Sequence, residues 1–379
     1  MMQENLLKVP QGDFLLHRLP QRRRELLRAW DAADELILDH IANEIILPRH
    51  SKILIVNDNF GALTTALNHF NPVSWSDSYL SHQATRNNLQ TNNLTLENIS
   101  FLTSLETPPD HYDLILIKIP KTLALLEDQL IKLQPGISSE TKIIAGGMIK
   151  GLTPNIWTLF ERIIGPTTTS LARKKARLIF ITPDNQIDRI NNPYPVKYIL
   201  ENTEYEITNH ANVFSRDSLD IGTRFFLQHL PQEPITGNII DLGCGNGILG
   251  IMAQKLHPAA SLHFIDESYM AIASAKENYR LVHGSAHTAY FHIGDGLAQF
   301  KEKSAHLILC NPPFHQHNAI SDHIATDMFK QSKRVLCKDG ELWVIGNRHL
   351  KYHLNLKKIF SNYSVVATNS KFIIYRSLI

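Results

Sequence analysis

Cysteine is scarce in this sequence, and the few cysteines do not form a metal-binding or disulfide pattern. Cys244, Cys310 and Cys337 are the only three, and no two of them form a C-x-x-C pair. An odd number without such a pair argues against a disulfide framework and against a zinc site, and it fits a reducing compartment. The histidines at 315, 317 and 323 have neither an H-E-x-x-H pattern nor a cysteine partner. We therefore expect no metal.

Long hydrophobic runs are also missing. The longest ones, such as residues 53–56 and 114–117, are strand-sized and far shorter than the roughly 20 residues that a membrane-spanning helix needs. The first residues do not show a basic segment followed by an apolar stretch, so a secretory signal is not expected. The sequence predicts a cytoplasmic protein without membrane contact.

Charge of one sign is not in excess. The chain has 38 Lys and Arg against 36 Asp and Glu, and residues 1–190 contain 20 of each kind. A polycation that binds nucleic acid through its bulk field is therefore excluded, and any such binding depends on local patches. The densest patch comprises Arg173, Lys174, Lys175 and Arg177. Two interpretations of it are open: a contact with RNA phosphates, or a solvated face.

The organisation along the chain indicates two domains. A length of 379 residues exceeds one ordinary core, and residues 183–197, rich in Pro, Asn and Asp, are typical of a linker. We therefore expect domains at 1–190 and 191–379. An amphipathic helix is predicted over about 24–46, and a β-hairpin is predicted just after the linker. Strands alternate with helices elsewhere, which predicts an α/β fold with parallel sheets.

A glycine-rich turn is the first motif with chemical meaning. The sequence D-L-G-C-G-N-G at 241–247 follows an apolar strand and precedes a helix-like run at 248–256. Glycines in such a strand–turn–helix let the backbone approach a ligand closely. The acid at the strand end suits a cationic amino-acid group better than a pyrophosphate. The residues expected to contact a cofactor here are Asp241, Gly243, Cys244, Gly245 and Asn246.

Acids at two further strand ends extend this site. Asp266, with Glu267, ends the apolar run 262–265 and lies where ribose hydroxyls would donate to a carboxylate. Asp295, with Gly296, follows a third predicted strand and is placed to accept from an adenine amino group. Each acid alone would be interpreted as a solvated loop residue. Because ligands bind at the carboxyl ends of strands in such sheets, the three acids together predict a cofactor site.

The segment Asn311-Pro312-Pro313-Phe314 decides the chemistry. It follows the apolar run 307–310, and its two prolines remove backbone donors and stiffen the turn. The Asn311 oxygen and the Pro312 carbonyl can both accept from one NH2 group and orient its lone pair, while Phe314 stacks on a flat ring. In isolation, N-P-P-F could equally be the end of a strand with a buried Phe. Because it follows the glycine-rich turn in the same half of the chain, it predicts an amine methyltransferase. In such an enzyme Cys244 and Cys310 are expected to be packing residues rather than nucleophiles.

The two halves of the chain also resemble each other. The alternative is a chance likeness of two α/β patterns, but three landmarks recur in order, which favours two tandem Rossmann-like domains with the first one degenerate. The matched positions are Asn57 with Asp241, Asp77 with Asp266 and Lys118 with Asn311. In the turn, this match places Asn59, Phe60 and Ala62 opposite Gly243, Cys244 and Asn246.

Together these motifs resemble the class I methyltransferases that modify exocyclic amines. The lead-in at 213–230 and the segment 311–329 resemble the bacterial ribosomal RNA guanine-N2 methyltransferases. The segments that are similar to the 23S large-subunit branch are 117–130, 165–178, 346–360 and 367–374. The resemblance implies S-adenosylmethionine as cofactor and guanine N2 in 23S rRNA as target, and we expect a monomer. Because a degenerate cofactor site can leave a usable cleft and surface, we also expect the N-terminal domain to recognise RNA.

The lead-in holds three further charged residues, Arg216, Asp220 and Arg224. They can shape the floor of the pocket or join the two halves, and Arg216 is a candidate RNA contact. Three alternatives to the predicted function stay open. A 16S rRNA enzyme is separated only by family resemblance. A protein glutamine methyltransferase would need no RNA binding and no N-terminal copy. A non-enzymatic RNA-binding factor would have a damaged glycine turn, whereas the turn at 241–247 is intact.

Overall fold

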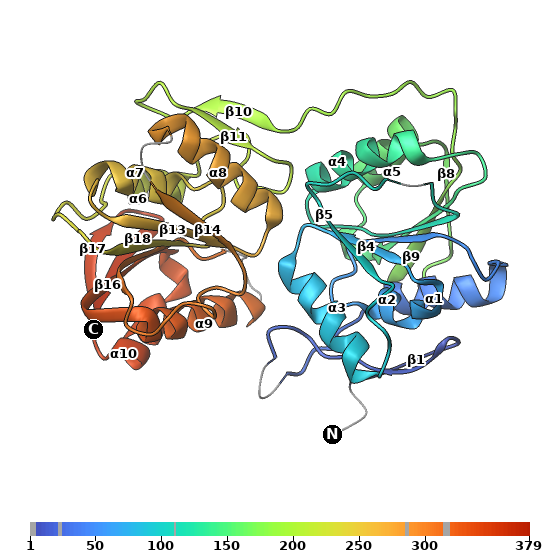
Figure 1. The fold of residues 1–379 in the computed structure, drawn as a ribbon, viewed down its shortest axis with the longest axis horizontal. Helices are drawn as coiled ribbons and strands as arrows, with labels where there is room; N and C mark the ends of the chain where they lie inside the picture. The colour runs from blue at the N-terminus through green and yellow to red at the C-terminus, as the bar shows by residue number, and fades with distance from the viewer. Residues whose placement is uncertain (1–4, 22–24, 110, 285–287, 314–318) are drawn as a thin grey trace. The chain divides into compact units, whose positions relative to one another are not determined.

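The computed structural model describes residues 5–21, 25–109, 111–284, 288–313 and 319–379 (Figure 1). The chain divides into two compact units, Met1–Tyr194 and Pro195–Ile379. Each unit contains one seven-stranded sheet covered by helices. The predicted linker contains no helix or strand between residues 183 and 195. The first strand of the second unit, β10, begins at Val196.

The N-terminal unit is built around a sheet with the strand order β5-β4-β3-β6-β7-β9-β8. Strands β3 to β7 run parallel, while β9 is antiparallel to both β7 and β8. In chain order the elements are β1 (Leu6–Val9), β2 (Gly12–Leu15), α1 (Ala32–Glu44), β3 (Ile53–Val56), α2 (Ala62–Ala66), η1 (Asn68–Phe70), β4 (Val73–Ser76), α3 (Tyr79–Thr91), β5 (Ser100–Thr103), β6 (Leu114–Lys118), α4 (Leu123–Leu133), η2 (Gln134–Gly136), β7 (Lys142–Met148), η3 (Ile149–Gly151), α5 (Pro154–Ile163), β8 (Thr167–Thr169) and β9 (Ala176–Ile181).

The C-terminal unit opens with the predicted hairpin and continues into a sheet with the order β14-β13-β12-β15-β16-β18-β17. Its elements are β10 (Val196–Ile199), β11 (Glu206–Asn209), α6 (Ile221–Leu227), β12 (Asn238–Leu242), α7 (Ile248–Leu256), β13 (Ser261–Asp266), α8 (Tyr269–His283), β14 (Ala289–Ile293), β15 (Ala305–Cys310), α9 (Ala319–Val335), β16 (Leu336–Asn347), η4 (Arg348–Leu350), α10 (Tyr352–Phe360), β17 (Ser364–Thr368) and β18 (Phe372–Leu378).

The two sheets have one topology. If the strands of each are counted from β3 and from β12, both read 3-2-1-4-5-7-6. In the N-terminal unit α4 and α5 pack on one face, and α1 and α2 on the other. In the C-terminal unit α6, α7 and α8 are opposed by α9 and α10. Central strands such as β3 and β6 are buried along their whole length because both faces are covered. The predicted tandem α/β fold is confirmed.

Strand pairing corrects the alignment of the two halves. Val56 pairs with Trp75 and Ile117, as Leu242 pairs with Ile265 and Cys310. The next positions are therefore equivalent, namely Asn57 with Gly243, Ser76 with Asp266 and Lys118 with Asn311. The match of Lys118 is confirmed. The matches of Asn57 with Asp241 and of Asp77 with Asp266 are wrong, because Ile55 and Ser76 occupy those places.

The same register changes the comparison of the turns. Gly61 and Gly247 both cap a following helix, with φ of 80° and 82°. Counting back from them, Asn57, Asp58 and Phe60 stand opposite Gly243, Cys244 and Asn246. The sequence match was displaced because it aligned a polar residue that follows β3 with an aspartate that lies inside β12.

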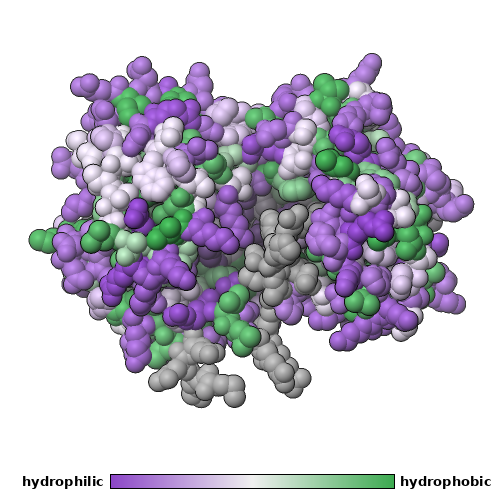
Figure 2. All heavy atoms as spheres, turned by 180° about the vertical axis from the view of Figure 1, so that it is seen from behind, coloured by the Kyte–Doolittle hydropathy of each residue, from purple (hydrophilic) through white to green (hydrophobic). Residues whose placement is uncertain are grey.

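The first long helix is shorter than predicted. Residues 24–46 were expected to be helical, but α1 begins at Ala32. Asp31 caps it, since its side chain accepts from the Ala33 and Asp34 amides while Asp34 accepts from the Asp31 amide. This reciprocal capping box fixes the start of the helix. In the parts of the chain that the structure describes, no helix is long and apolar enough to cross a membrane. Figure 2 shows a mainly hydrophilic face with scattered apolar residues.

Candidate functional site

The predicted cofactor and substrate residues gather at one edge of the C-terminal sheet. Strands β12, β13, β14 and β15 are all parallel. Their carboxyl ends therefore share one edge, which is where open α/β sheets bind ligands. The glycine turn follows β12, Asp266 ends β13, and Asp295 and Asn311 follow β14 and β15. The fold thus brings together the motifs that the sequence analysis selected.

The glycine turn has a backbone that side chains rarely tolerate. Gly243, Gly245 and Gly247 have φ of 71°, 54° and 82°. A Cβ at Gly247 would lie 2.9 Å from that of Ala275, so this glycine allows α7 and α8 to approach closely. At Gly245 a Cβ would meet nothing within 4 Å. The turn therefore leaves an open backbone surface at Gly245, where a ligand can lie.

Asp266 holds that turn in place. One carboxylate oxygen accepts from the Gly245 amide and the other from the Ser268 amide, each at 3.0 Å. The Asn246 side chain points to the hairpin, where its amide nitrogen donates to the Asn209 side-chain oxygen at 2.9 Å. Asp266 is only half-buried, so its placement fits the predicted ribose contact. Asn246 connects the turn to β11.

Asp241 lies beneath the turn. It is 1% exposed, and its carboxylate accepts from the Gly250 amide at 2.8 Å. Burial raises its pKa to about 8, partly opposed by this hydrogen bond and reinforced by the nearby Asp266 carboxylate. The acid therefore supports the start of α7 from below. Direct contact of Asp241 with a cofactor stays a prediction.

The buried Asp241 carboxyl should make stability fall with pH. The folded chain retains this proton up to about pH 8, whereas an ordinary aspartate loses it near 3.8. Between these values the folded state binds more protons, so stability decreases as pH rises. Asp241→Asn should remove this contribution, and its limiting size is about 1.4 kcal/mol per pH unit. Thermal unfolding of both proteins from pH 5 to 8, without added cofactor, measures it. Parallel pH profiles would contradict a buried, protonated Asp241.

The third acid is also partly removed from water. Asp295 is half-buried, and burial followed by the charge of Asp327 raises its pKa. Gly296 next to it has φ of 51°. Glu267, the residue after β13, is half-buried. The roles of these three residues toward a cofactor stay predictions.

Asn311 is held with its amide oxygen free. Its nitrogen donates to the Thr223 hydroxyl at 3.0 Å. Its oxygen is buried and has no hydrogen-bond partner among the described residues. Pro312 is buried and Pro313 is exposed, whereas Phe314 lies outside the residues that the structure describes. An unpartnered buried acceptor is costly, so this oxygen is suited to receive a donor from a ligand.

Thr223, which the sequence analysis missed, sets this orientation. Its hydroxyl and its amide both donate to the Asp220 carboxylate, at 3.2 and 2.8 Å. The hydroxyl proton is thereby directed to Asp220, which leaves the oxygen lone pairs for the Asn311 NH2 group. Asp220 is the N-cap of α6. The only sequence signal was the cap pattern D-x-x-T at 220–223, which is common at helix starts.

The cysteines beside the site are not poised as nucleophiles. Cys244 and Cys310 are buried, and burial raises the pKa of both thiols well above the ordinary value. They therefore stay protonated and pack, as predicted. The described residues contain no cluster of metal ligands. His323 is exposed, and the histidines at 315 and 317 lie outside the described residues.

Ion pairs already occupy part of the predicted RNA-binding cluster. Arg173 pairs with Asp39 at 2.7 Å, and Lys174 pairs with Glu35 at 2.6 Å. Lys175 is exposed and Arg177 is half-buried. The Arg216 side chain pairs with Asp217 and donates to the Ala211 carbonyl, both at 3.0 Å. These contacts favour structural roles for Arg173, Lys174 and Arg216, and RNA contacts at the cluster stay predictions.

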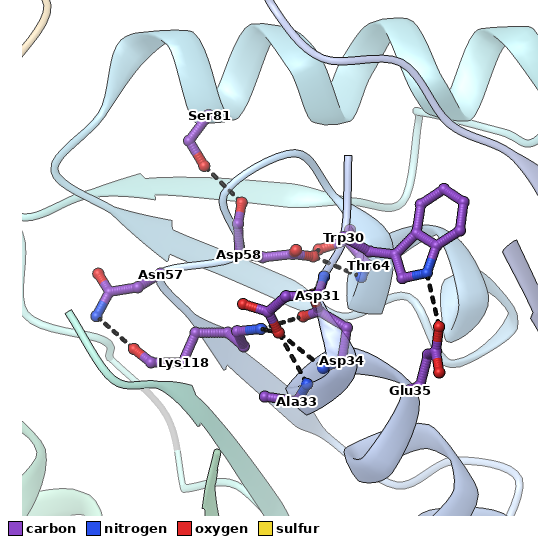
Figure 3. Close-up of polar contacts among 10 residues, drawn as sticks. All are labelled: Trp30, Asp31, Ala33, Asp34, Glu35, Asn57, Asp58, Thr64, Ser81 and Lys118. Atoms are coloured by element: carbon purple, nitrogen blue, oxygen red, sulfur yellow. Dashed lines mark hydrogen bonds and ion pairs between the residues drawn. The ribbon is translucent and has the colours of Figure 1, made fainter. Parts of the chain in front are cut away.

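The corresponding edge of the N-terminal sheet is filled by its own side chains (Figure 3). Lys118, at the position of Asn311, is 5% exposed and contacts the carboxylates of Asp34 and Asp31 at 2.7 and 2.8 Å. Asn57 exchanges hydrogen bonds with Gln129 at 2.8 and 2.9 Å. These groups satisfy one another where the other unit has an open turn, so this copy lacks the features of the predicted cofactor site.

Two protein-family models match the two halves of the chain. The family model described as the RLMG N-terminal domain matches residues 4–185, and the one described as the Methyltransferase small domain matches residues 204–376. The ribosomal RNA large subunit methyltransferase G of Erwinia tasmaniensis is 49% identical over 96% of each chain. That of Streptomyces avermitilis is 45% identical over 98% of each chain.

Among solved structures, the T. thermophilus 16S rRNA N2 G1207 methyltransferase, in complex with AdoMet and guanosine, has a TM-score of 0.77 at 17% identity. The match covers 98% of this chain and 97% of that one, and it shows the tandem fold. The two relatives named above share much more of the sequence, with 45% and 49% identity over nearly the full length. This similarity shows that the chain belongs to the ribosomal RNA large subunit methyltransferase G family.

Proposed function

We propose that the C-terminal unit transfers a methyl group from S-adenosylmethionine to the exocyclic N2 amine of a guanine in 23S rRNA. The observation that carries this proposal is the buried side-chain oxygen of Asn311, which has no hydrogen-bond partner among the described residues and can therefore accept a hydrogen bond from an amine of the substrate. The names of the relatives support a large-subunit rRNA substrate. The enzyme would act in the cytoplasm as a monomer.

The residues at the strand ends fit this cofactor. The open backbone at Gly245 offers a surface, and Asp266 and Asp295 offer acceptors for ribose hydroxyls and an adenine amine. When bound, S-adenosylmethionine supplies a sulfonium methyl that passes to the amine nitrogen as the carbon–sulfur bond breaks and leaves a neutral thioether. Asn311 and the Pro312 carbonyl would hold both amine hydrogens and direct the lone pair. The surplus proton can leave to solvent, so no strong base is needed.

Methyl transfer to separated substrates tests the proposal. The protein is incubated with labelled S-adenosylmethionine and either 23S rRNA, 16S rRNA or ribosomal protein from cells lacking this gene. We expect label in 23S rRNA, released on digestion as N2-methylguanosine. Label in 16S rRNA or protein would overturn the assignment of substrate and keep amine chemistry. Cofactor binding without label in any fraction would favour a binding role.

A further inference from the structure

The surface beside the candidate site carries basic side chains that form no ion pair with a carboxylate of the described residues. Residues 342–379 contain six Lys and Arg and no Asp or Glu. Five of them are exposed, and three of these five, Arg348, Lys351 and Lys371, follow β16 or precede β18. Across the described residues, none of these three forms an ion pair with a carboxylate, whereas Arg376 pairs with Glu341. We call Arg348, Lys351 and Lys371 the basic rim.

The basic rim lies at the carboxyl edge of the sheet. Strand β16 runs parallel to β15, and Arg348 follows its last residue. Lys371 precedes Phe372, the first residue of β18, which pairs with Asn347 at the end of β16. The Arg348 amide donates to the Lys371 carbonyl at 3.0 Å. The Arg348 guanidinium donates to the Asn369 carbonyl at 3.1 Å, which steadies it on the turn before β18.

A short series of contacts joins the rim to Asn311. A Cβ added at Gly222, in the first turn of α6, would lie 3.1 Å from the Phe372 ring, so the helix start packs on that ring. The next residue, Thr223, receives the Asn311 amide hydrogen. Lys371 and Asn311 are thus separated by one ring and one helical turn. Charge on the rim therefore borders the place where the base would enter.

This arrangement differs from the cluster at 173–177. There, Arg173 and Lys174 are paired with carboxylates of α1. Cations without such partners can neutralise nucleic-acid phosphates without first breaking an ion pair. Phosphate contacts of this kind fix the position of the nucleic acid and leave base recognition to other groups.

We propose that the basic rim binds the RNA phosphates that flank the base in the site. This inference rests on the proposed function, because it requires RNA as the substrate. The rim would position the strand, while Asn311 would act on the amine. Binding of 23S rRNA should then depend on salt partly through Arg348 and Lys371.

The test compares two double variants with the same change of charge. Arg348→Gln with Lys371→Gln removes the two rim charges that are linked through their backbones. Lys357→Gln with Lys358→Gln is the control, since both lysines are exposed near the end of α10, at the opposite edge of the sheet. The full-length proteins are titrated with deproteinised 23S rRNA from cells lacking this gene, at several salt concentrations. S-adenosylmethionine affinity is measured in parallel.

The rim variant should bind the RNA roughly tenfold more weakly, with a log–log salt slope reduced by about 1 to 2, while the control stays near wild type. Cofactor affinity should be unchanged in both. Equal affinities and equal slopes for the two variants, with RNA binding by the wild type intact, would overturn the inference about the rim. A wild-type protein that does not bind 23S rRNA would instead contradict the proposed function.

Discussion

Asn311→Ala should lower the rate of methyl transfer about 100- to 1,000-fold while leaving S-adenosylmethionine affinity nearly unchanged. The substitution removes the acceptor that we propose for the substrate amine and leaves the glycine turn and Asp266 unchanged. Single-turnover rates with 23S rRNA measure the first quantity, and calorimetric titration with the cofactor measures the second. Comparable losses in both would indicate that Asn311 holds the site together rather than the amine.

Substitution of Thr223 tests whether the orientation of the Asn311 side-chain amide matters, because it leaves the amide itself in place. Thr223→Val retains the shape of the side chain but removes the hydroxyl that fixes the Asn311 nitrogen. With the amide free to rotate, kcat should fall by about tenfold with little change in KM. Thr223→Ser restores the hydroxyl and should restore kcat. A Ser variant as slow as the Val variant would contradict the positioning role.

Much of the candidate site could be predicted because its signals are local. Gly243, Gly245 and Gly247 require left-handed backbone at three alternating positions, and few other turns need that pattern. Asp266 and Asn311 each follow an apolar run, and parallel strands place such positions at one edge. The fold follows from the same alternation of strands and helices, which is repeated in both halves.

The missed features depend on contacts between distant residues. Thr223 acts on Asn311 across 88 positions of the chain. The start of α1 is set by a capping box whose Asp31 and Asp34 also bind Lys118, more than 80 positions away. The misaligned landmarks have a similar cause, since a strand register is fixed by pairing with neighbours. Side-chain chemistry alone does not reveal it.

The basic residues show a further limit of composition. The cluster at 173–177 is the densest in the sequence, yet Arg173 and Lys174 are paired with acids from α1. Arg348 and Lys371 are 23 positions apart and do not form a cluster in sequence. A backbone hydrogen bond from Arg348, the residue after β16, to Lys371, the residue before β18, places them together. Which cations stay free for a phosphate is therefore a property of the fold.

Lys118→Met should destabilise the N-terminal unit by about 3–5 kcal/mol, because it removes the buried ammonium group that pairs with Asp31 and Asp34. The Lys118 and Asp34 side chains are only 6% and 7% exposed. The Asp34 carboxyl already has a pKa of about 6, raised mainly by burial and held down mainly by Lys118. Without the lysine its ionisation would meet no opposing charge, and its pKa would rise further. The midpoint of the thermal unfolding transition of the N-terminal unit should fall by on the order of 10 °C.

The control is Lys121→Met, which removes an exposed lysine three residues away and should shift the midpoint by little. Adding Asp31→Asn and Asp34→Asn to Lys118→Met removes the uncompensated carboxylates, retains a side-chain oxygen for the cap, and should recover part of the loss. Recovery would show that unpaired buried charge, not lost packing, causes the effect. If Lys118→Met unfolds at the same temperature as the wild type, the buried ion pair does not stabilise the N-terminal unit.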